Sequence, residues 1–122
     1  MADLQHMIKG MSEDERRQWI VSLNDHLRRS GQTCYGATAI STAFNDVSDE
    51  VIEQLMTLVR DFKDFDPAFD NNGLHEAGEI ELDGLKAYWE IIYHDDRFQH
   101  LSGDPEDVTL TFRELTLHRR QL

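Results

Sequence analysis

The sequence has little cysteine and proline and no long apolar segment, and each shortage excludes a class of protein. Its 122 residues include one cysteine and two prolines. A single cysteine cannot form an internal disulfide, which is typical of a protein that folds in a reducing compartment. No apolar run approaches the roughly 20 residues of a membrane-spanning helix, and the N-terminus lacks the basic-then-apolar order of a signal peptide. We therefore expect a cytoplasmic protein with no membrane partner.

Basic residues are scarce in the middle of the chain. Residues 44–107 contain 18 of the 24 Asp and Glu but only four of the 12 Lys and Arg, so this stretch carries more than the whole net charge of −12. Such a field repels nucleic acid and attracts cations, basic peptides or the basic groove of another protein. Direct binding to nucleic acid is disfavoured on the same ground, because phosphate contacts dominate that affinity.

Two helices are predicted from caps and apolar spacing. Ser12 and Glu15 form a capping box ahead of apolar residues at helical spacing, and Gly31 follows them, which predicts a helix over 12–30. Ser48 can cap a second helix, and the wide apolar face that follows it suits packing against a sheet.

Three segments are typical of strands. Residues 33–43 are rich in small and β-branched residues, and Cys34 within them is expected to be a small buried residue. Residues 79–93 alternate around Asp83-Gly84, the pattern of a two-residue hairpin turn. Residues 108–117 alternate with a change of parity, which predicts a β-bulge at Arg113-Glu114.

Together these elements predict an α+β domain with an antiparallel sheet of three to four strands and two helices packed on one face. The domain spans residues 1–122, with 1–11 as a loose arm or a short helix. Trp89 is expected beneath the helices, and residues 65–78 form a loop that is dense in turn formers.

Acids and a histidine crowd into the 64–76 loop. The loop does not fit a standard calcium-binding loop, because the first ligand position would be Ala68. If two strand ends meet, the loop could join His94-Asp95-Asp96 in a divalent-metal site that serves hydrolysis or structure. The spacing matches no established metal motif, and the sequence has no nucleophile elbow or phosphate-binding loop. We therefore expect a protein that is not an enzyme and has no cofactor, and keep the metal site as the alternative.

Several short motifs follow one another in a characteristic order along the chain. They are Leu23-Asn24-Asp25-His26-Leu27-Arg28, Phe62 with Phe65, Asp83-Gly84, Tyr88-Trp89-Glu90-Ile91, Tyr93-His94-Asp95 and Gly103-Asp104-Pro105. Over residues 20–118 the chain resembles a bacterial family of small acidic proteins of unknown function (domain of unknown function family 3768), often seen on plasmids and other mobile elements. In the loop, Leu74 stands where the family has an acid and Ala77 where it has an aromatic residue. These departures preserve acidity but not a reactive site, which favours binding over catalysis.

Charge and resemblance together lead to one functional hypothesis. The protein would be a non-catalytic inhibitor from a mobile element, of the anti-CRISPR or anti-restriction kind. It would block a basic nucleic-acid-binding surface of a protein or defence complex by DNA-like charge. An acidic accessory domain with another partner stays open, as does a homodimer. The candidate partner-binding residues are Asp46, Asp49, Glu50, Glu53, Asp61, Asp64, Asp66, Asp70, Glu76, Glu79, Glu81, Asp95, Asp96, Asp104, Glu106 and Asp107.

Overall fold

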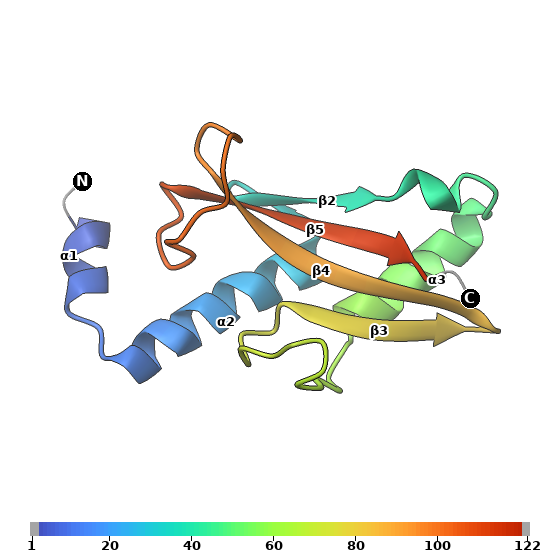
Figure 1. The fold of residues 1–122 in the computed structure, drawn as a ribbon, viewed down its shortest axis with the longest axis horizontal. Coiled ribbons are helices and arrows are strands. Elements are labelled where there is room, and N and C mark those ends of the chain that lie inside the picture. The colour runs from blue at the N-terminus through green and yellow to red at the C-terminus, as the bar shows by residue number, and fades with distance from the viewer. Residues whose placement is uncertain (1–2, 121–122) are drawn as a thin grey trace.

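A five-stranded sheet forms one layer of the protein, and two helices cover one of its faces (Figure 1). The structure is a computed structural model that describes residues 3–120. Within this range, no helix is both long enough and apolar enough to cross a membrane. The elements in chain order are α1 (Asp3–Lys9), α2 (Glu13–Ser30), β1 (Gln32–Thr33), β2 (Gly36–Ile40), η1 (Thr42–Phe44), α3 (Asp49–Arg60), β3 (Ala77–Leu82), β4 (Leu85–Asp95) and β5 (Thr111–Arg119).

Both predicted helices are confirmed, and their caps explain where they begin and end. At α2 the Ser12 hydroxyl accepts from the Glu15 amide at 3.1 Å, and the Glu15 carboxylate accepts from the Ser12 amide at 3.1 Å. These bonds lower the pKa of the Glu15 carboxyl. Gly31 ends α2 in the left-handed region, with φ of 78°. Ser48 caps α3, because its hydroxyl accepts from the Val51 amide at 3.3 Å.

The first 11 residues and the sheet differ in detail from expectation. Residues 3–9 form the short helix α1, while residues 1 and 2 lie outside the described part of the chain. The sheet has five strands in the order β1-β2-β5-β4-β3, rather than three or four. It is mixed rather than antiparallel, because β2 runs parallel to β5. The α+β class is as predicted.

The segment 33–43 is two short strands rather than one. The Thr33 hydroxyl accepts from the Tyr35 amide at 3.2 Å, and this local bond stabilises a tight turn between β1 and β2. Cys34 lies in that turn and is exposed, so its predicted burial in a strand is wrong. The chain then leaves the sheet after Ile40 and enters η1.

The β3–β4 hairpin is confirmed, but the β-bulge is not. Asp83 and Gly84 have φ of 51° and 85°, as a type I′ turn requires. Strand β5 begins at Thr111 rather than at 108, and its register with β4 is unbroken from Thr111 to Arg119. The apparent change of parity arises because Arg113, a charged residue, takes a core-facing position in β5.

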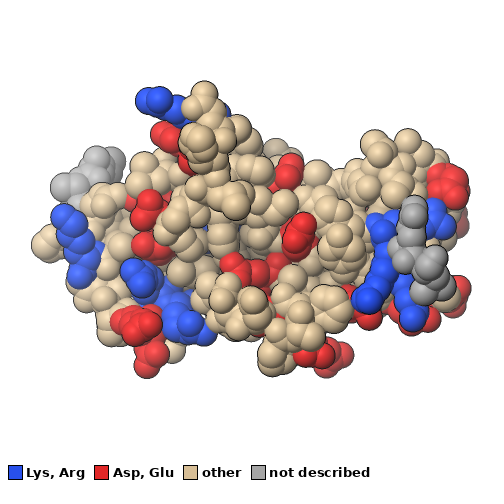
Figure 2. All heavy atoms as spheres, in the orientation of Figure 1, with Lys and Arg blue, Asp and Glu red and all other residues tan. Residues whose placement is uncertain are grey.

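The core lies between the helices and one face of the sheet, and the other face is uncovered. Trp89 is fully buried beneath the helices, as expected, and Phe62 packs edge-on against it with ring centres 5.5 Å apart. The opposite face carries two histidine–glutamate pairs, His94–Glu114 at 3.3 Å and His118–Glu90 at 3.0 Å. Figure 2 views this face and shows acids scattered over its middle, with basic side chains gathered beside the C-terminal end.

We expect Gly78→Ala to destabilise the protein by about 1–3 kcal/mol, because a Cβ there would lie 2.5 Å from the ring of Phe62. Gly103→Ala is the matched control, since a Cβ there meets nothing within 4 Å. The control should change stability by less than about 0.5 kcal/mol. Urea unfolding of both variants measures this, and equal midpoints would contradict the tight packing of Phe62 on β3.

Candidate functional site

The 16 candidate acids fall into three groups, and three of them are buried. Asp70 is 5 % exposed and accepts from the amides of His75 and Glu76 at 3.1 and 2.9 Å. Asp107 accepts from the Thr109 amide at 2.9 Å and from the side chain of Gln5. Glu106 is also buried, with Arg16 at 3.9 Å. These three carboxylates stabilise loops and are not accessible to a partner, which sequence alone did not indicate.

A second group of candidate acids makes hydrogen bonds or ion pairs near the surface. Asp95 accepts from the amide of Gln99, which lowers the pKa of its carboxyl, and it also accepts from the amide of Arg97. Asp66 accepts from the amide of Ala68 at 2.9 Å. The other members pair with side chains: Asp46 with Arg119, Glu53 with Arg60, Glu76 with Asn72 and Glu79 with Arg120.

The third group consists of exposed acids whose carboxylates have no partner within residues 3–120. They are Asp49, Glu50, Asp61, Asp64, Glu81, Asp96 and Asp104. Three of these, Asp61, Asp64 and Glu81, lie close together, with Glu79 of the second group beside them. Asp61 and Asp64, which follow α3, join Glu79 and Glu81 of β3 around a hollow of about 350 Å³. We call this site the acidic hollow. Its other lining residues are Leu58, Phe62, Lys63 and Ile80.

A buried arginine of α2 positions the acidic hollow. Arg28 is 2 % exposed, and its Nη1 donates to the carbonyls of Val59, Arg60 and Phe62 at 2.9, 2.9 and 3.1 Å. These carbonyls lie at the C-terminal end of α3, where a cation also complements the helix dipole. The bonds determine how the chain leaves α3, and therefore where Asp61 and Asp64 lie.

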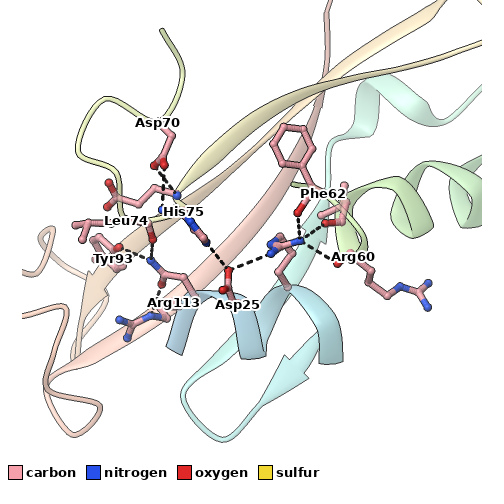
Figure 3. Close-up of polar contacts among 12 residues, drawn as sticks. Asp25, Arg60, Phe62, Asp70, Leu74, His75, Tyr93 and Arg113 are labelled. Carbon is pink, nitrogen blue, oxygen red and sulfur yellow. Dashed lines mark hydrogen bonds and ion pairs between the residues drawn. The ribbon is translucent and has the colours of Figure 1, made fainter. Parts of the chain in front are cut away.

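Arg28 also belongs to a chain of polar contacts that reaches the 64–76 loop (Figure 3). Its Nη2 donates to Asp25 Oδ1 at 3.0 Å, and His75 Nδ1 lies 2.9 Å from that same oxygen. His75 stacks on Phe65 with ring centres 3.8 Å apart. The contact of His75 with Asp25 therefore joins the loop to α2, and the stack on Phe65 joins two parts of the loop to each other.

A second buried arginine closes the network on the other side. Arg113 is fully buried; its Nε donates to Asn24 Oδ1 at 2.7 Å, and its Nη2 donates to the carbonyl of Pro105. The Asn24 amide donates to the carbonyl of Leu74 and to the hydroxyl of Tyr93, at 2.9 and 2.8 Å. Burial lowers the pKa of Arg113 and raises the pKa of Tyr93.

The structure does not bring together the histidines of the predicted metal site. His75 faces α2 on the helix-covered side of the sheet, whereas His94 pairs with Glu114 on the uncovered side. Among residues 3–120, no group of three or more His, Cys, Asp and Glu side chains is arranged to hold a metal ion. An aspartate bonded to a histidine, as in the Asp25–His75 pair, is an arrangement also found in catalytic sites. Here neither residue lines one of the pockets described, and Asp25 also bonds to Arg28.

Residues 40–120 match a family described as proteins of unknown function (DUF3768). The chain belongs to this family. The matched segment contains the whole acidic hollow together with β3, β4 and β5, whereas α2 lies outside it. No curated protein and no solved structure matches the chain.

Sequence reasoning missed the three buried polar residues of the polar network, Asn24, Arg28 and Arg113, of which Arg28 bonds to the segment that leads into the acidic hollow. A signal was present for each of them. Asn24 and Arg28 are four residues apart and share the helix face of Leu23 and Leu27, so they interrupt an apolar stripe. Arg113 occupies the same parity as Leu115 and Leu117. A polar residue at an apolar position indicates a buried, hydrogen-bonded group.

We expect Arg28→Met to destabilise the protein by about 3–5 kcal/mol, because it leaves three carbonyls and the Asp25 carboxylate without their donor. Arg29→Met removes the same charge from an exposed neighbouring position and should cost less than about 0.5 kcal/mol. Urea unfolding compares them, and a similar cost for both would show that the network contributes little.

Stability should fall as the pH rises above about 10, where the unfolded tyrosine ionises. Burial raises the pKa of Tyr93, so the folded protein keeps the phenol neutral while the unfolded chain loses its proton. Tyr93→Phe should therefore flatten the decline between about pH 9 and about pH 11.5, although it loses the bond from Asn24. Unfolding midpoints across this range measure the slope, and an unchanged slope would contradict the assignment.

Proposed function

We propose that this protein is a non-catalytic binding protein whose acidic hollow docks onto a basic surface of a partner protein. The observation that carries the proposal is the convergence of Asp61, Asp64, Glu79 and Glu81 from two separate segments onto one hollow with a single lysine in its lining. Exposed carboxylates in a rigid arrangement meet Lys and Arg side chains with little reordering.

The net charge gives this docking its kinetic character. A protein of net charge −12 is steered toward a basic surface over a distance set by the ionic strength. Association is therefore fast at low salt and slows steeply as salt is added. Mutation of rim charges should change mainly the association rate.

The basic surfaces that suit this charge best are those that otherwise bind nucleic acid. Their Lys and Arg side chains are spaced to meet phosphates, and carboxylates of similar spacing can satisfy the same donors. More specifically, the protein would be an inhibitor encoded by a mobile element. It would occupy the nucleic-acid-binding surface of a defence complex, either a CRISPR effector or a restriction enzyme.

The test compares two variants of equal net charge. Asp61→Asn/Asp64→Asn/Glu81→Gln neutralises the acidic hollow, and Asp14→Asn/Asp96→Asn/Asp104→Asn neutralises three exposed acids elsewhere. Tagged proteins are used to capture partners from a lysate of a host that expresses defence systems, with elution by a salt gradient and competition by DNA. We expect the first variant to lose a DNA-binding partner at a salt concentration that the second variant tolerates.

Equal behaviour of the two variants would show that net charge, rather than the hollow, determines binding. If no nucleic-acid-binding protein is recovered, or if DNA does not compete with the captured partner, the proposal that this protein imitates the charge of DNA is wrong. Unfolding curves for both variants establish that each one is folded before binding is compared.

A further inference from the structure

Strand β3 is the longer of the two edge strands of the sheet. The sheet order ends in β3 on one side and in the two-residue β1 on the other. β3 has six residues, Ala77–Leu82, with no lysine, proline or bulge to discourage pairing with another chain. Only β4 pairs with it within residues 3–120.

The pairing with β4 shows which backbone groups of β3 point outward. Leu82 pairs with Leu85 across the two-residue turn, and the amide of Ile91 donates to the carbonyl of Glu76 at 2.7 Å. Hydrogen-bonded pairs alternate along an antiparallel ladder, so even-numbered residues of β3 bond to β4. The amides and carbonyls of Ala77, Glu79 and Glu81 therefore face away from the sheet. No described residue bonds to them.

Charged and apolar side chains flank this outward edge in an alternating pattern. Glu79 and Glu81 project from the uncovered sheet face, while Ile80 between them faces the helix side. Beside Ile80 the acidic hollow presents the apolar side chains of Leu58 and Phe62. A strand added here would meet acid, apolar surface and acid at successive positions.

We propose that the edge of β3 binds an extended segment of the partner in which basic and apolar residues alternate, adding it as a sixth, antiparallel strand. This inference rests on the proposed function, because it names how the partner occupies the acidic hollow. One basic residue of the segment pairs with Glu81, which has no ion-pair partner among the described residues, and a second pairs with Glu79 in place of Arg120. The apolar residue between them lies over Leu58 and Phe62.

Charge argues against a second copy of this chain as the occupant. Two β3 edges paired with each other would place glutamates opposite glutamates, and like charges directly opposite destabilise a sheet. A basic segment has the opposite effect, since each cross-strand pair then joins opposite charges.

The probe for the test is a capped Lys-Val-Lys-Val-Lys peptide, titrated into the whole protein and followed by NMR. We expect the amides of Ala77, Glu79 and Glu81 to shift and to gain protection from hydrogen exchange as the peptide binds. The amides of Gly78 and Ile80 already bond to β4 and should change little.

Two methylated peptides separate strand addition from simple charge attraction. In the proposed register the amide of the central lysine faces β3, whereas the amide of each valine faces solvent. N-methylation of the central lysine should weaken binding about tenfold, and N-methylation of one valine should have little effect. Glu81→Gln should weaken binding by about two- to fivefold, while Asp14→Asn, which changes an exposed acid of α2, should not.

The proposal is overturned if methylation of the central lysine leaves the affinity unchanged, if the three outward amides gain no protection, or if the peptide does not bind. Dimerisation of the protein through β3 would also overturn it, in favour of a second copy. Loss of partner binding in the hollow variant, combined with peptide binding that methylation does not affect, would leave the proposed function intact and remove only the strand addition.

Discussion

Two buried arginines set the constraint on which much of this structure depends. A guanidinium group in a small core must find acceptors, because an unpaired buried charge costs several kcal/mol. Arg28 finds three carbonyls at the end of α3 and the carboxylate of Asp25. Arg113 finds Asn24 and the carbonyl of Pro105, and its guanidinium lies 5.1 Å from the ring centre of Tyr93. Each set of acceptors belongs partly to a loop, so the bonds that the arginines make also position the loops. Arg28 Nε and Arg113 Nη1 are buried without a hydrogen-bond partner among the described residues.

Burial separates acidic residues that a partner cannot reach from exposed ones that it can. Asp70 and Asp107 stabilise their loops through backbone amides. Asp61, Asp64 and Glu81 are exposed, and their carboxylates have no bonding partner within residues 3–120. They line the acidic hollow, which the contacts of Arg28 help to position. Net charge alone does not separate these populations, because burial and pairing decide which carboxylates a partner can reach.

Local patterns were sufficient to predict most of the elements. The capping box at Ser12, the cap at Ser48 and the Asp83-Gly84 turn depend on contacts within a few residues, and all three are present in the structure. The beginning of β5, the break between β1 and β2 and the parallel pairing of β2 depend on distant segments. Arg113 illustrates the difference, because its partner Asn24 is 89 residues away. The sequence pattern does not show this partner, so a core-facing arginine in the strand suggested a β-bulge.

The sequence by itself determined the α+β class, the limits of α2, the hairpin and the concentration of acid in residues 44–107, because each follows from composition or from local hydrogen bonding and periodicity. The tertiary structure alone decided that β3 lies at an edge, that His75 and His94 face opposite sides of the sheet, and that Asp61 and Asp64 lie beside Glu79 and Glu81. Strand order and loop position result from long-range packing and burial, in which residues far apart in sequence satisfy one another.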